Sequence, residues 1–99
     1  MNFGYINEIA NSMRLHGVSQ EIQLIKLTEE VGEAAEAFIG QLGLNPRKGF
    51  SHSKEDFIME LADVVVTAMV GIEMAGADPE TIIDKKLDYI KARYMKVGR

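Results

Sequence analysis

The stretch "FIMELADVVVTAMVGI", residues 57–72, decides the fold because it is apolar on almost every side of a helix. Its apolar residues recur at spacings of three and four, which indicates an α-helix and not a strand. The side chains that cover most of the circumference are Phe57, Ile58, Leu61, Val64, Val65, Ala68, Met69 and Ile72. Because a helix of this kind hides most of its surface, we predict that it is central in its domain or in an assembly.

The sequence before this stretch predicts two further helices. Apolar residues at positions 3, 6, 9, 10 and 13 form one helical stripe, which ends at "HGVS", where Gly17 suits a helix end. Ser19 suits the N-cap of a second helix over about residues 20–41. The apolar face predicted for the second helix consists of Leu24, Leu27, Val31, Ala34, Ala35, Phe38 and Leu42.

A loop and two capping signals complete the predicted organisation. "GLNPRKGFSH", residues 43–52, interrupts the helical pattern with two glycines and a proline. Ser53 and Asp56 have the spacing of a capping box that starts a third helix, and Asp78 with Pro79 starts a fourth. Since 99 residues leave no room for a second domain, we predict one all-α domain over residues 1–99. Its four helices would include a central helix–loop–helix hairpin and assemble into a helical-bundle oligomer.

Composition excludes several classes of function. The net charge of −4 argues against nucleic acid or an anionic membrane as the main partner. The chain has no cysteine, which excludes a disulfide scaffold, a thiolate zinc site and a cysteine nucleophile. The most apolar run is shorter than the roughly 20 residues that span a bilayer. The N-terminus has neither a basic leader nor an apolar core, so we expect no signal peptide and a cytoplasmic protein.

Carboxylates gather at two places along the predicted helices. "LTEEVGEAAEAF", residues 27–38, holds Glu29, Glu30, Glu33 and Glu36, and taken alone it is typical of a solvated acidic face. Glu60 and Asp63 instead lie within the apolar third helix, where an unpaired charge is costly. No basic residue lies three or four positions from either of them.

A short antiparallel hairpin would bring the two groups of carboxylates face to face. Oxygen ligands without cysteine and with little histidine select a hard cation, Mg²⁺ or Mn²⁺. We therefore predict a metal site between the second and third helices. The alternative, in which the acidic side chains only cap helices and form salt bridges, stays open.

The order and spacing of these carboxylates are similar to a known signature. "EEVGE", residues 29–33, followed across a loop by "ELAD", residues 60–63, resembles the EExxE…ExxD motif of MazG-like nucleoside triphosphate pyrophosphohydrolases, within the all-α NTP pyrophosphatase superfamily. The resemblance covers about residues 20–76. It implies Mg²⁺-dependent hydrolysis of a nucleoside triphosphate (NTP) between the α and β phosphorus, which gives a monophosphate and pyrophosphate.

The resemblance also implies roles for single residues. Glu30, Glu33, Glu60 and Asp63 would be the metal ligands, and Glu29 would complete the metal shell or orient a water. Arg47 and Lys48 in the loop are candidates for binding substrate phosphates, although ordinary surface charge explains them equally well.

Family members form dimers, often paired into tetramers, so the resemblance implies a homodimer or homotetramer. Two other functions stay open at this point. One is a phosphoribosyl-ATP pyrophosphatase, which belongs to the same superfamily. The other is a non-catalytic helical dimerisation module whose acidic residues only face solvent.

Overall fold

The computed structural model describes residues 1–97 of the chain, and the side chains of residues 1–95. These residues form four helices and no strand: α1 (Gly4–Leu15), α2 (Gln20–Leu42), α3 (Lys54–Met74) and α4 (Pro79–Val97). The predicted all-α class and number of helices are therefore confirmed for this part of the chain. None of the helices is long and apolar enough to cross a bilayer.

Helices α2 and α3 begin at the capping residues that the sequence predicted. The Ser19 hydroxyl accepts a hydrogen bond from the Ile22 backbone N–H at 3.2 Å, which caps α2. Ser53 and Asp56 form both hydrogen bonds of a capping box at the start of α3, at 2.9 and 3.0 Å. At the other end of α2, Gly43 has a φ of 64°, a left-handed conformation that glycine adopts without strain.

Removing the cap of α3 should therefore destabilise the fold measurably. We expect Ser53→Ala to lower the free energy of unfolding by about 1 kcal/mol, because the Asp56 N–H loses its acceptor. Urea unfolding of the metal-free chain measures this. An unchanged midpoint would mean that the start of α3 does not contribute to the cooperative unit.

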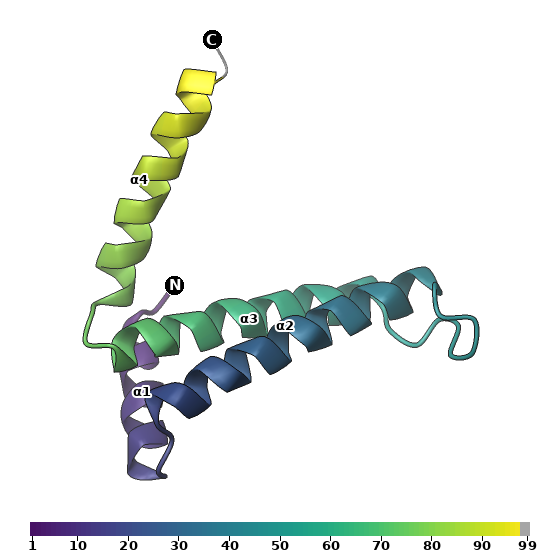
Figure 1. Ribbon diagram of the computed structural model, residues 1–99, viewed down its shortest axis with the longest axis horizontal. Helices are drawn as coiled ribbons and strands as arrows, with labels where there is room; N and C mark the ends of the chain where they lie inside the picture. The colour runs from purple at the N-terminus through teal and green to yellow at the C-terminus, as the bar shows by residue number, and fades with distance from the viewer. Residues whose placement is uncertain (98–99) are drawn as a thin grey trace.

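Helix α3 contacts each of the other three helices, as predicted for a central helix. Helices α2 and α3 lie side by side and run in opposite directions, with the connecting loop at one end of the pair (Figure 1). Helix α1 lies at the other end of the pair, and α4 projects away from the pair at that end. A hydrogen bond from the Ser51 N–H to the Gly40 carbonyl (3.1 Å) folds the loop back onto α2. A Cβ on Gly40 would clash with the side chains of Ser51 and His52, so this approach requires glycine.

The apolar face predicted for α2 was wrong in most of its members. Leu24, Val31 and Phe38 are between 43% and 65% exposed, whereas Ala34 is buried. Six of the buried or half-buried positions of α2 form a different stripe, at spacings of three and four: Gln23, Leu27, Glu30, Ala34, Ala37 and Gly40. This stripe is rich in small and polar side chains, so hydrophobicity alone does not identify it.

The matching positions on α3 complete what we call the α2–α3 seam. Five of the half-buried positions of α3 also recur at spacings of three and four: Phe57, Glu60, Val64, Thr67 and Gly71. Phe57 packs against Phe38 with ring centroids 5.0 Å apart. Small residues allow the two backbones to approach closely, and each side of the seam contains one glutamate. The geometry of the pair therefore places Glu30 and Glu60 between the helices.

The hydrophobic core of the single chain is small. It lies where α1 meets the C-terminal half of α3, and its buried residues are Ile6, Ala10, Met69, Val70 and Met74. The radius of gyration is 16.6 Å, compared with about 13 Å for a compact domain of this length. A second apolar stripe of α3 (Ile58, Leu61 and Val65) is 44–51% exposed. The chain thus has more apolar surface than its own helices cover.

Candidate metal site

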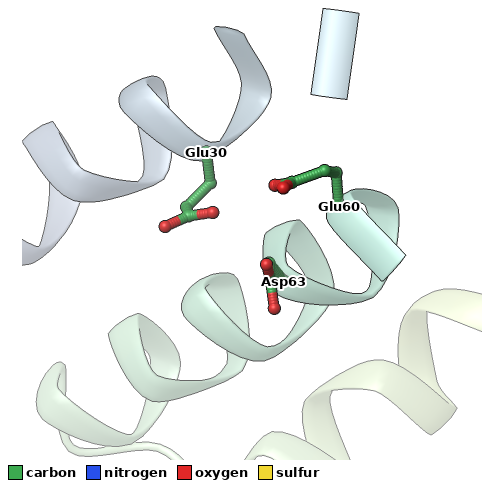
Figure 2. A group of neighbouring side chains, drawn as sticks. All are labelled: Glu30, Glu60 and Asp63. Atoms are coloured by element: carbon green, nitrogen blue, oxygen red, sulfur yellow. The ribbon is translucent and has the colours of Figure 1, made fainter. Parts of the chain in front are cut away.

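Three carboxylates from two helices converge within the α2–α3 seam. Glu30 comes from α2, whereas Glu60 and Asp63 come from neighbouring turns of α3. Figure 2 shows the three side chains pointing into the same space between the helices. Each offers one carboxylate oxygen, and these three oxygens all lie within 4.8 Å of one another. Oxygens on opposite sides of one Mg²⁺ or Ca²⁺ ion are about 4–5 Å apart, so the cluster has the dimensions of a site for one divalent cation.

Two carboxylate oxygens of these residues are buried without a hydrogen-bond partner. They are the Oε2 atoms of Glu30 and Glu60, whose side chains are half-buried in the seam. Within the described residues, no lysine, arginine or histidine nitrogen lies within 4.0 Å of the three carboxylates. Buried acceptors are normally paired, but the described part of the chain supplies no partner for these two atoms.

The surroundings of Glu30 disfavour its ionised form. Its pKa is raised above the usual value, first by burial and then by the negative charges of Glu33, Asp63 and Glu60. Each of these causes favours the protonated carboxyl when the site holds no metal. A divalent cation among the same oxygens would reverse that preference, because it stabilises the ionised form.

The other predicted site residues lie around this cluster. Glu33, one turn after Glu30, is exposed, but it is close enough to raise the pKa of Glu30. Glu29 is exposed and does not belong to the three-carboxylate group. Glu33 is therefore at the edge of the cluster, and Glu29 is on the solvent side of α2.

The structure does not bring the loop cations to the carboxylates. Lys48 Nζ lies 3.5 Å from Glu36 Oε1, and both side chains are about half exposed or more. Glu36 is six residues beyond Glu30, which corresponds to about 9 Å along the helix axis. The Arg47 side chain is exposed and forms no ion pair in the described part of the chain.

One polar residue of the seam, Gln23, was not identified from the sequence. Gln23 is 2% exposed, its Nε2 donates to the Thr67 carbonyl at 3.0 Å, and its Oε1 has no hydrogen-bond partner. Its spacing of seven residues from Glu30 could have identified it, because residues seven apart share one helix face.

Comparisons of the chain with protein-family models, with curated proteins and with solved structures found no match. The functional interpretation therefore depends on the geometry of the site and on the sequence motif.

The raised pKa predicts an unusual effect of substitution on stability. In the metal-free chain at neutral pH, Glu30→Gln should raise the free energy of unfolding, because it removes a charge that burial and neighbouring carboxylates disfavour. As the pH falls through the folded-state pKa, Glu30 becomes protonated and the penalty disappears. The advantage of the glutamine should therefore shrink on acidification.

Thermal unfolding with a chelator, over a series of pH values, measures this difference. Glu36→Gln is the matched control. It also removes a glutamate from α2, but this glutamate pairs with an exposed lysine, Lys48. A Glu30→Gln chain that is less stable than native at neutral pH would contradict the electrostatic description.

Proposed function

We propose that this protein is a Mg²⁺-dependent nucleoside triphosphate pyrophosphohydrolase of the MazG-like kind. The observation that carries the proposal is the convergence of Glu30, Glu60 and Asp63, with two buried unpaired oxygens and, among the residues that the structure describes, no basic side chain within 4.0 Å. These residues belong to both halves of the EExxE…ExxD motif. The reaction consumes one water and yields a nucleoside monophosphate and pyrophosphate.

The three carboxylates would hold the metal, with Glu33 moving in from the edge of the cluster. Bound Mg²⁺ would neutralise charge on the triphosphate and lower the pKa of the attacking water. Glu33, at the edge of the cluster, or Glu29, on the solvent side of α2, would orient that water and accept its proton. No covalent nucleophile is needed.

Lys48 and Arg47 are proposed to bind substrate phosphates. Lys48 would first leave Glu36, and an exposed ion pair contributes only about 0–1 kcal/mol, so a triphosphate could compete for it. Mn²⁺ has similar ligand preferences and could replace Mg²⁺.

The active form is proposed to be a homodimer or homotetramer, in which α2–α3 hairpins pack into a helical bundle. The support is the exposed apolar surface on α2 and α3, which a monomer in water would leave uncovered. The same surface favours the competing function, a non-catalytic dimerisation module. Assembly alone therefore does not distinguish the two.

The products of the reaction test the proposal. The chain should be incubated with a panel of ribo- and deoxyribonucleoside triphosphates and Mg²⁺, and the products identified by ³¹P NMR. We expect nucleoside monophosphate and pyrophosphate in equal amounts. Diphosphate with inorganic phosphate would exclude cleavage between the α and β phosphorus.

Adding phosphoribosyl-ATP to the panel separates the alternatives. Turnover of phosphoribosyl-ATP, with none of free nucleotides, would favour the histidine-synthesis enzyme. No turnover of any substrate by an assembled, metal-supplied chain would favour the dimerisation module.

A further inference from the structure

A groove of about 570 Å³ lies along the α2–α3 seam, toward the N-terminus of α2. Its apolar walls come from Leu24 and Leu27 on α2 and from Ala68 and Ile72 on α3. The polar residues Gln20, Glu21 and Gln23 also line it, at the end toward the start of α2. Its volume falls within the roughly 300–1,000 Å³ typical of small-molecule sites. Thr67, which lines it, is one turn after Asp63, and Leu27 is one turn before Glu30. The groove and the carboxylates therefore occupy consecutive segments of one seam.

Gln23 contributes an unsatisfied polar group to this apolar groove. Its carboxamide is held in place by the bond from Nε2 to the Thr67 carbonyl, while Oε1 remains a buried acceptor without a partner. A buried acceptor without a partner is costly, so a purely structural clamp does not account for this oxygen. Gln20 provides the comparison: it also lines the groove and its Nε2 makes a similar bond to the Met74 carbonyl, but its side chain is exposed, so water can reach its oxygen.

The chemistry of the groove selects among the parts of a nucleotide. A flat ring can lie against leucine and isoleucine side chains and still present N–H groups at its edge. A pentose would place hydroxyls against the apolar walls, and an aliphatic group would leave Oε1 unpaired. Gln23 precedes Glu30 by seven residues, or about 10 Å along the axis, which leaves room for a sugar between a base and the phosphates.

We propose that this groove binds the nucleobase of the substrate, and that Gln23 Oε1 accepts a hydrogen bond from a ring N–H or exocyclic amine. The identification of the ligand as a nucleotide rests on the proposed function. Gln23 is then a specificity-determining residue, and the metal site needs no contribution from it.

The test uses nucleosides, which carry no phosphate and need no metal. Adenosine, guanosine, cytidine and uridine are titrated in turn into the native, isotope-labelled chain with a chelator, followed by ¹H–¹⁵N NMR. At least one nucleoside should shift the Gln23 side-chain amide together with the backbone amides of Thr67 and Ala68. Ribose should leave them unchanged.

Substitutions then separate recognition from clamping. Gln23→Leu should weaken nucleoside binding about tenfold or more, since it removes the only proposed polar contact. Gln20→Leu, which removes the similar clamp, should leave the affinity for nucleoside near native. Equal losses in the two variants would overturn the proposal. The NMR titration of the native chain remains decisive if Gln23→Leu does not fold.

The outcomes distinguish this inference from the proposed function. Nucleoside shifts at Gln23 in a chain that hydrolyses no triphosphate would reject the enzyme and retain the base site. Hydrolysis without such shifts, or with shifts confined to another surface, would overturn the base site and retain the enzyme.

Discussion

Glu60→Gln should lower kcat/KM for nucleoside triphosphates by about 100-fold or more. The substitution keeps the size and polarity of the side chain but removes one of three converging carboxylates. Changes in groups that merely support metal ligands already reduce affinity or activity by roughly 10- to 100-fold, so loss of a ligand should have at least that effect. Steady-state assay of pyrophosphate release measures it.

The control for this experiment is Glu36→Gln. Glu36 lies on the same helix as Glu30, but its partner is Lys48 and it is outside the cluster. We expect kcat/KM within a few fold of native, with kcat unchanged and any difference confined to KM. Loss of activity in Glu36→Gln comparable to that in Glu60→Gln would show that general acidity, and not the cluster, matters.

Val65→Lys should convert the proposed oligomer into a monomer. Val65 is 47% exposed on the second apolar stripe of α3 and lies away from the three carboxylates. Burying a valine contributes about 1.5–3 kcal/mol, and a two-fold interface contains each residue twice. The dissociation constant of a dimer should therefore rise by 100-fold or more.

Analytical ultracentrifugation over a range of concentrations measures this change. Leu15→Lys is the matched control, because Leu15 is an exposed apolar residue at the end of α1, outside the α2–α3 pair. A native chain that sediments as a monomer would contradict the proposed assembly. Dissociation by both variants would place the interface elsewhere.

Local signals in the sequence were sufficient for the helices. Ser19, Ser53 and Asp56 form the hydrogen bonds that their types and spacing predict. Capping depends on residues within one turn, so no knowledge of the tertiary fold was needed. The helical periodicity of residues 57–72 likewise indicated the central helix that contacts the other three.

The packing face of α2 could not be predicted in the same way. The helix has an apolar stripe, with Leu24, Val31 and Phe38, and a stripe of small and polar residues, with Ala34 and Ala37. Hydrophobicity favours the first, but the chain buries the second more deeply. A helix with two packing faces does not reveal which of them is used within the chain and which is available to a partner.

Of the predicted site residues, the structure brings Glu30, Glu60 and Asp63 together. Glu60 and Asp63 were identifiable because carboxylates are unexpected in an apolar helix. The relative positions of Glu30 and Glu33 depend on the rotation of α2 about its axis, which the tertiary packing decides. The sequence makes Lys48 a candidate for binding phosphate. Its contact with Glu36 could not be predicted, because it depends on the path of the loop.

Thermal unfolding with and without a divalent metal tests the central claim most directly. At a metal concentration about 100 times Kd, binding should raise the Tm of the native chain by on the order of 10 °C. Mg²⁺ and Mn²⁺ should both have this effect, and Glu60→Gln with Asp63→Asn should abolish it. A native Tm that does not respond to either metal, or an equal rise in the double variant, would contradict a metal site between α2 and α3.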